Sequence, residues 1–128
     1  MRACLAQINT TVGDFESNRK KILDALSFAA REKCQAVFFP EMTVTGYPPE
    51  DLLFKKSFVE ENGKILRSLA PHTRGLLAVV GFAEKDLKTG SLYNSAAVFE
   101  KGKLQFIYRK NKLPNYGVFD EKRYFSEG

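Results

Sequence analysis

Two charged side chains in this sequence follow apolar segments that are typical of buried strands. Glu41 comes directly after the segment FFP, and Lys110 follows the segment LQFIY after one further residue, Arg109. Open α/β sheets place their ligands at the carboxyl ends of the strands. A carboxylate that is partly removed from water at such a place can serve as a general base. A lysine beside a carboxylate stays charged and can stabilise an oxyanion that develops during a reaction.

Both residues also have an ordinary structural interpretation. A glutamate at the end of a strand can point into water, and most lysines lie on solvated surfaces. Arg109 and Lys112, on either side of Lys110, are expected to face solvent because side chains alternate along a strand. Neither Glu41 nor Lys110, taken alone, identifies an enzyme.

The other residues that could act as nucleophile, base or metal ligand are few. Cys4 lies in the apolar pattern RACLAQIN and Cys34 ends a helical pattern, so both are expected to be inert thiols without a disulfide. Their spacing does not suit zinc, and we predict no metal site. His72 is the single histidine and follows Pro71 in a stretch typical of a loop. A triad with a histidine base is therefore not expected.

Length and composition indicate one soluble globular domain. The chain has 128 residues, of which 44% are apolar, enough to bury a core. Its net charge is +5, and acidic residues are spread among the basic ones. This distribution favours a mixed solvated surface over a nucleic-acid site. No apolar stretch has the length of a membrane span and the first residues lack the pattern of a signal peptide, so we expect a cytoplasmic protein without a membrane partner.

The apolar patterns predict an α/β fold that begins with parallel strands and ends with antiparallel ones. Strands are expected at residues 3–8, 36–40 and 76–84, and the second and third are continuous apolar runs that suit strands covered on both faces. Residues 91–100 and 103–110 are typical of a hairpin with its turn at Lys101 and Gly102. Together these elements are expected to form one layered unit without repeats or linkers.

Two helices are expected between these strands. Ser17 is the predicted N-cap of the first, whose apolar residues recur on one face. Glu50 and Asp51 suit the first turn of the second, which follows the loop TVTGYPP. Asn62 interrupts the apolar stripe of that second helix.

Three segments, in order, resemble the nitrilase superfamily of carbon–nitrogen hydrolases. They are AQINTTVGDFESN, FFPEMTVTGY and YRKNKLPNYGVFDE. The segments TGYPPEDLL and LPNYGVFDEKRYF are similar, more narrowly, to the amino-terminal glutaminase domain of glutamine-dependent NAD synthetases. The resemblance implies a partial nitrilase-type α-β-β-α sandwich with mixed sheets. Residues 1–128 would then form the N-terminal part of the glutaminase domain, with some strands of both sheets and without the synthetase domain.

The resemblance also implies roles for particular residues. In the family a cysteine attacks the amide, a glutamate takes the thiol proton and returns it to the leaving ammonia, and a lysine stabilises the tetrahedral intermediate. The glutamate corresponds here to Glu41 and the lysine to Lys110. We expect the charged groups of these two residues to lie together at one end of the sheet. A further glutamate that supports the lysine corresponds to Glu121. Tyr116 corresponds to the tyrosine that contacts the glutamine substrate.

The family's nucleophilic cysteine lies on a later strand, and the chain ends at Gly128 before reaching it. Cys4 and Cys34 do not match it, so these residues alone are expected to be inactive. By the resemblance, glutamine is the substrate and its ammonia amidates deamido-NAD to NAD. The domain itself needs no cofactor, whereas ATP and magnesium belong to the synthetase domain, its partner. A homo-oligomer is also expected.

Two alternatives remain open at this point. One is a stand-alone amidase or nitrilase of the same superfamily, against which the segment PPED argues. The other is a noncatalytic interaction module that keeps the scaffold without the chemistry. A strand with a cysteine after Gly128, followed by a phosphate-binding loop, would identify the synthetase.

Overall fold

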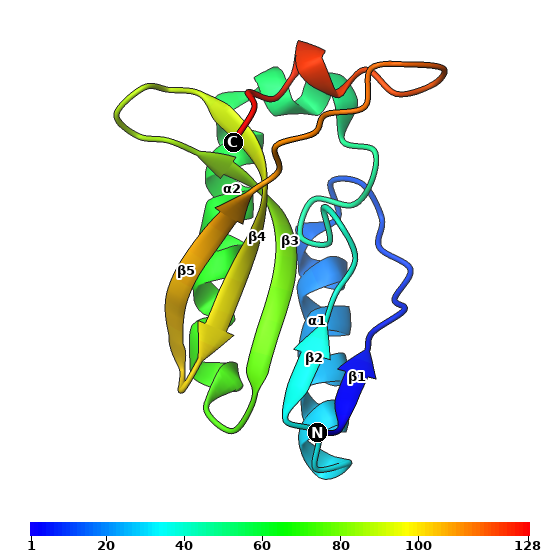
Figure 1. Cartoon of the computed structure of the whole chain (residues 1–128), viewed down its shortest axis with the longest axis vertical. Helices are drawn as coiled ribbons and strands as arrows, with labels where there is room; N and C mark the ends of the chain where they lie inside the picture. The colour runs from blue at the N-terminus through cyan, green and yellow to red at the C-terminus, as the bar shows by residue number, and fades with distance from the viewer.

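The computed structural model describes all 128 residues and contains a single five-stranded sheet (Figure 1). The strands stand side by side in chain order: β1 (Ala3–Leu5), β2 (Ala36–Phe38), β3 (Leu77–Lys85), β4 (Leu92–Glu100) and β5 (Lys103–Arg109). β1, β2 and β3 are parallel, whereas β4 and β5 run antiparallel to their neighbours. The predicted α/β class and the change from parallel to antiparallel pairing are confirmed.

The expectation that strands of two sheets would be present is wrong. β4 pairs with β3 over eight residues, from Leu92 opposite Lys85 to Phe99 opposite Ala78. The hairpin of β4 and β5 therefore extends the parallel sheet instead of starting another. Its turn is the predicted one: Lys101 and Gly102 have φ values of 55° and 76°, the left-handed region in which glycine is favoured.

Both α-helices lie on the same face of the sheet. α1 (Phe15–Arg31) packs behind the parallel strands and α2 (Lys56–Ser68) behind the hairpin (Figure 1). The core between helices and sheet joins Ile22, Leu26 and Leu66 to Val80 and Phe99, all buried. Three short 3-10 turns complete the chain: η1 (Glu50–Phe54), η2 (Ala70–Thr73) and η3 (Glu121–Arg123). No helix is both long and apolar enough to cross a bilayer.

The helices begin at other residues than the sequence predicts. Asp14, not Ser17, is the N-cap of α1, and its carboxylate accepts a hydrogen bond of 3.1 Å from the Ser17 N–H. Glu50 and Asp51 lie in η1, since the extended backbone of Lys55 separates that turn from α2. The buried Asn62 bonds to the backbone of Ala83, so this polar side chain joins α2 to β3.

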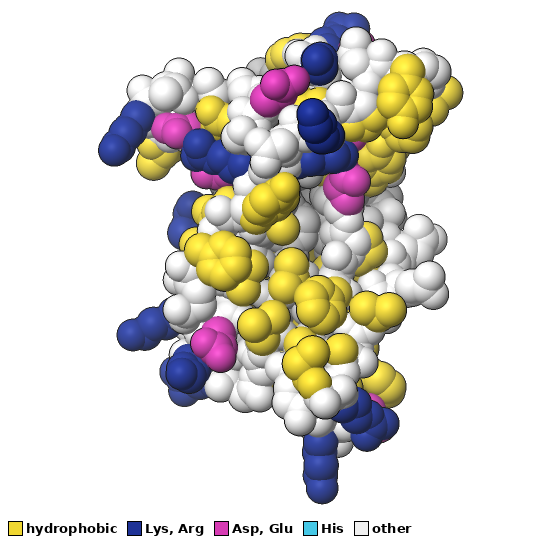
Figure 2. All heavy atoms as spheres, in the orientation of Figure 1, with side chains coloured by type: hydrophobic (Ala, Val, Ile, Leu, Met, Phe, Trp, Pro, Cys, Tyr) yellow, Lys and Arg dark blue, Asp and Glu magenta, His cyan; other side chains and the backbone are white.

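The face of the sheet opposite the helices carries a row of apolar side chains. Strand register aligns Leu5, Phe38, Val79, Val98 and Phe106 across the five strands. Because side chains alternate along a strand, these residues point away from the helical core. Figure 2 shows hydrophobic side chains gathered on this face. Leu5, Phe38 and Phe106 are 76%, 38% and 58% exposed, whereas Val98, in the middle of the hairpin, is 9% exposed. No helix lies over this row, and its outer members are open to solvent.

Candidate active site

Three of the four predicted site residues, Glu41, Lys110 and Glu121, lie together at one end of the sheet. Glu41 follows β2, Lys110 follows β5, and Asn94 lies near the start of β4. Since β4 is antiparallel to its neighbours, its amino end lies beside the carboxyl ends of β3 and β5. Segments that are distant in sequence are thereby brought to the upper end of the sheet in Figure 1.

Gly81 lets the segment that carries Glu41 lie directly on β3. A Cβ atom at Gly81 would stand 2.5 Å from the Pro40 carbonyl oxygen and 2.9 Å from the Glu41 Cα. The next residue, Met42, has a φ of 51°, which turns the chain sharply after Glu41. The Val44 N–H then bonds to the Gly81 carbonyl at 3.2 Å. This close contact fixes where the Glu41 side chain begins.

Glu41, Asn94, Lys110 and Glu121 form one hydrogen-bonded group, which we call the carboxylate–lysine cluster. The Lys110 Nζ lies 3.0 Å from the Glu41 Oε1 and 3.0 Å from the Glu121 Oε1. The expected proximity of the Glu41 and Lys110 charges is confirmed, although 69 positions separate the two residues. The Asn94 Nδ2 donates to both carboxylates, to Glu41 and at 3.4 Å to Glu121.

The two carboxylates of the cluster stabilise the charged form of Lys110. Burial opposes the charged form of Lys110, but the hydrogen bonds to Glu41 and Glu121 raise its pKa above the ordinary value. The pKa of the nearby Tyr47 phenol is raised too, first by burial and then by the same two carboxylates. Lys110 is therefore a permanent cation at neutral pH, able to stabilise a developing negative charge.

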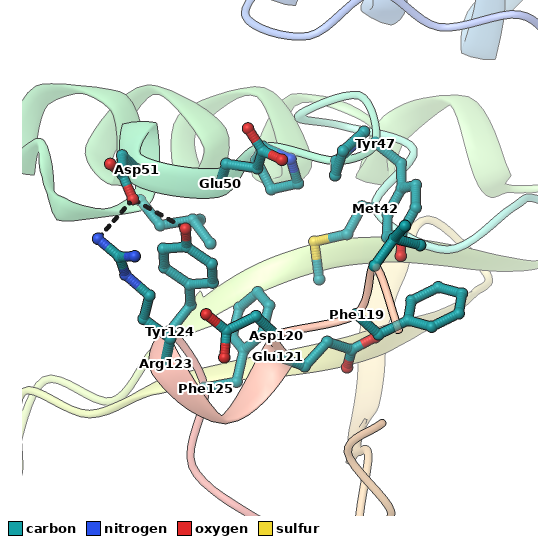
Figure 3. A pocket seen from close by; sticks show the side chains of 14 residues that line it. Met42, Tyr47, Glu50, Asp51, Phe119, Asp120, Glu121, Arg123, Tyr124 and Phe125 are labelled. Carbon is teal, nitrogen blue, oxygen red and sulfur yellow. Dashed lines mark hydrogen bonds and ion pairs between the residues drawn. The ribbon is translucent and has the colours of Figure 1, made fainter. Parts of the chain in front are cut away.

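Two cavities reach the cluster. One of about 500 Å³ lies between the segment Tyr47–Asp51 and the segment Val118–Phe125, and Glu121 lines it (Figure 3). The other, of about 200 Å³, is lined by Glu41, Asn94 and Lys110 together with Tyr108. The second cavity opens on the uncovered face of the sheet, since Val79 and Gly81 of that face also line it.

Contacts between the last segment and η1 hold Glu121 in place. The Tyr124 phenol donates to the Asp51 Oδ1 at 2.8 Å, and Arg123 forms an ion pair with the same oxygen at 3.3 Å (Figure 3). The backbone N–H of Phe125 bonds to the Glu121 carbonyl at 2.9 Å. These contacts bury Glu121, which is 7% exposed, and aim its carboxylate at Lys110.

Tyr116 is the predicted site residue that the structure does not bring to the cluster. Its ring is 72% exposed and lines neither cavity. It packs edge-on against Phe119 with 5.8 Å between ring centres, and Phe119 does line the larger cavity. Tyr116 thus lies outside the cluster, beside one lining residue of the larger cavity, and its role in substrate binding stays a prediction.

Arg109 is only partly exposed to solvent, with 33% of its side chain open, although the sequence suggested a solvent-facing residue. Its guanidinium makes a two-pronged ion pair with Glu84, at 2.8 and 2.7 Å, and lies 3.9 Å from the centre of the Tyr93 ring. Asp86 contacts the same group at 3.2 Å. Arg109 does alternate to the face opposite Lys110, but that face places it beside Glu84 of β3 and Asp86 just after β3, so its guanidinium is paired instead of free in water. Lys112 is exposed, as predicted.

The remaining candidates lie away from the cluster. Cys4 and Cys34 are free thiols, as expected, and line neither of its cavities. His72 lies in η2, just before β3 begins and hence at the opposite edge of the sheet. Asn94 was not predicted from the sequence as a site residue. A polar residue within the apolar strand LYNSAAVFE was a signal, but its partners are 53 and 27 positions away.

The chain has an α/β fold with one mixed sheet, and two carboxylates and a lysine are hydrogen-bonded to one another at one end of that sheet. This arrangement suits acid–base chemistry. The model of the carbon-nitrogen hydrolase family matches residues 2–128, and the chain belongs to that family. It is 48% identical, over an alignment of 130 positions, to the glutamine-dependent NAD(+) synthetase of Thermotoga maritima, covering all of this chain and 22% of the synthetase. The chain thus spans about a fifth of the length of this relative.

Solved structures give the same result. The glutamine-dependent NAD+ synthetase of Acinetobacter baumannii superposes with a TM-score of 0.92 at 37% identity, over 98% of this chain and 24% of that one. A mutant amidase from Nesterenkonia sp. AN1, with acrylamide added at its active site cysteine, gives a TM-score of 0.82 at 26% identity. That match covers all of this chain and 50% of the amidase.

Proposed function

We propose that this chain is the N-terminal part of a glutaminase domain that supplies ammonia for NAD synthesis. The observation that carries the proposal is the carboxylate–lysine cluster, in which Lys110 bonds to Glu41 and Glu121 at one edge of the sheet. Similarity to two NAD synthetases favours glutamine as the substrate. A synthetase domain that uses ATP and magnesium to amidate deamido-NAD would be the partner of this domain, within a homo-oligomer.

In this mechanism Glu41 takes the proton of a cysteine thiol, and the sulfur attacks the amide carbon of glutamine. Lys110 stabilises the negative charge on the carbonyl oxygen of the tetrahedral intermediate. The C–N bond then breaks, and Glu41 returns the proton to the departing ammonia. Water hydrolyses the resulting thioester to glutamate. Glu121 holds Lys110 in position, and Tyr116 contacts the substrate.

In this proposal the nucleophile comes from outside residues 1–128, since Cys4 and Cys34 line neither cavity of the cluster. The smaller cavity opens on the uncovered face of the sheet, so a cysteine carried by a segment on that face could reach Glu41 and Lys110. The 128-residue chain by itself is therefore expected to be inactive and to resist labelling by an electrophilic glutamine analogue. Stoichiometric labelling at Cys4 or Cys34, detected by mass spectrometry, would contradict this mechanism.

The experiment that tests the proposal uses the complete gene product and Lys110→Met. We expect NAD synthesis from glutamine to fall by about 100-fold or more, because the oxyanion loses its cation. Synthesis from free ammonia should be largely unchanged. Lys112→Met is the matched control, since Lys112 is a neighbouring but exposed cation. An equal loss of both activities in Lys110→Met would indicate a folding defect and contradict the assigned role.

Similarity to the Nesterenkonia amidase favours a second candidate, a stand-alone amidase. The same assay separates the two, because an amidase would hydrolyse small aliphatic amides and make no NAD from either nitrogen source.

A further inference from the structure

Asn94 contacts every charged member of the carboxylate–lysine cluster. Its Nδ2 donates to Glu41 Oε1 and to Glu121 Oε2, and its backbone carbonyl accepts the Lys110 N–H at 2.9 Å. The side chain is buried, with the residue 5% exposed. Both facing groups are carboxylates, which only accept hydrogen bonds when ionised, so the amide nitrogen must point toward them.

The bonds to Glu41 fall on one of its two oxygens. Lys110 and Asn94 both contact Oε1, and no hydrogen bond of the protein reaches Oε2. A carboxylate held through one oxygen cannot rotate freely, so its other oxygen keeps a fixed direction. The Glu41 side chain is 44% exposed, and the residue lines the cavity that opens on the uncovered face. Oε2 is thus the oxygen available to a reacting group.

We propose that Asn94 is a positioning residue that fixes the Glu41 carboxylate, so that Oε2 takes the thiol proton and returns it to the leaving ammonia. The inference rests on the amide hydrolysis proposed above and assigns a further residue to it. The catalytic step is unchanged: the proton moves from sulfur to Oε2 and then to nitrogen, and Asn94 itself exchanges no proton.

The residue type fits this task. Two carboxylates share a single ammonium, and like charges at short distance repel one another. A neutral amide adds a donor to each carboxylate without adding charge. An aspartate here would bring a third negative charge, and a leucine would leave both carboxylates with fewer donors in a partly buried site. The backbone bond to the Lys110 N–H does not depend on the residue type, so a substitution at position 94 tests the amide side chain alone.

The test is Asn94→Leu in the complete gene product, with Asn9→Leu as the matched control. Asn9 is exposed, lies in the loop after β1, and lines neither cavity of the cluster. We expect kcat for amide hydrolysis to fall by about 100-fold in Asn94→Leu, because a small misplacement of the base is costly. KM should stay within about threefold, since substrate binding is not the step affected. Asn9→Leu should keep the wild-type kcat.

A double variant separates positioning from a general structural role. If Asn94 acts through Glu41, then Asn94→Leu should lower the residual rate of Glu41→Gln by less than about threefold, because the two residues act as a unit. Multiplicative losses would contradict the proposal. So would a wild-type kcat in the single variant.

A structural measurement makes the test independent of the substrate. In a crystal structure of Asn94→Leu, we expect the Glu41 carboxylate to rotate away from its position beside Lys110. An unmoved carboxylate would overturn the proposal even if the protein proved inactive on every amide. The hydrolysis assay is run on glutamine and on aliphatic amides. Turnover of only the latter would refute the glutamine assignment while still testing Asn94.

Discussion

At the scale of single residues, Glu121 is the buried carboxylate of the cluster. Its side chain is 9% exposed, and both of its oxygens lie within 3.1 Å of the Lys110 ammonium. Glu121→Gln keeps the shape of the side chain but removes the charge that orients the lysine. We expect kcat for glutamine hydrolysis to fall by about 100-fold, because the cation would no longer be held at the oxyanion position.

The matched control for this prediction is Glu127→Gln. Glu127 is 63% exposed and pairs with Lys122 at 3.3 Å on the surface, where such pairs contribute little. Steady-state kinetics of both variants, with ammonia-dependent synthesis as the folding check, would decide. Equal activity of the two variants would remove Glu121 from the site.

Residue-level prediction from sequence worked where the signal is local. Glu41 and Lys110 follow apolar strands directly, so their place at a sheet edge could be predicted, and the motifs added Glu121. The contacts of Asn94 and Arg109 could not be predicted, because their partners come from other strands and later loops. A side chain's burial partners depend on the register of the sheet, which short motifs do not specify.

At the scale of elements, the crossing of the Glu41 segment over β3 depends on Gly81. Gly81→Ala would place a methyl group 2.5 Å from the Pro40 carbonyl oxygen, so the backbone of the segment must move. We expect the free energy of unfolding to fall by about 1–3 kcal/mol, the usual cost of overpacking. We also expect amide hydrolysis to be lost, because the displacement begins beside Glu41.

Gly75→Ala is the control, since nothing lies within 4 Å of a Cβ atom built there. Urea unfolding of both variants measures the stability change. An unaltered free energy of unfolding in Gly81→Ala would show that the segment is not held against β3.

The ion pair between Glu84 and Arg109 connects β3 to the end of β5 and predicts how stability depends on pH. The hydrogen bond from Arg109 lowers the pKa of Glu84 below its ordinary value of 4.5, although burial acts in the opposite direction. The folded state therefore binds this proton less readily than the unfolded state. Its contribution to stability is complete above pH 4.5 and is lost as the pH falls through the folded pKa.

Glu84→Gln removes this titration. We expect the variant to be less stable than the wild type at pH 7 but to lose less stability between pH 5 and pH 3, roughly the window of the carboxyl titration. Urea unfolding across this range measures it, with the exposed Glu60→Gln as control. The same acid sensitivity in Glu84→Gln and wild type would contradict the prediction.

The positions of helices, strands and turns could be predicted from the sequence where residues close together in the chain determine them. The turn at Lys101 and Gly102 and the apolar strands are set by neighbouring residues. The start of α1 was misplaced by a few residues because Asp14 and Ser17 are both good capping residues and only the folded geometry selects one. The single sheet was missed because pairing between β3 and β4 is a contact between separate segments of the chain.

At the scale of the whole molecule, the sheet has one covered face and one open face. The helices bury the first, whereas the row formed by Leu5, Phe38, Val79, Val98 and Phe106 lies on the second (Figure 2). The two outer strands, β1 and β5, also have an unpaired edge each. Open apolar faces and unpaired edges recruit other chains. We therefore expect the isolated 128-residue chain to self-associate in a concentration-dependent way.

Phe106→Ser tests whether this association uses the open face. Phe106 is 58% exposed and lies on β5, where it pairs with Val98, so a polar side chain should weaken association without disturbing the helical core. Leu87→Ser is the matched control, because Leu87 is 92% exposed but lies in the turn between β3 and β4, away from the row. Sedimentation velocity over a range of concentrations should show a smaller weight-average mass for Phe106→Ser only. A monomeric wild-type chain, or equal effects of both variants, would mean that the apolar row is not an association surface.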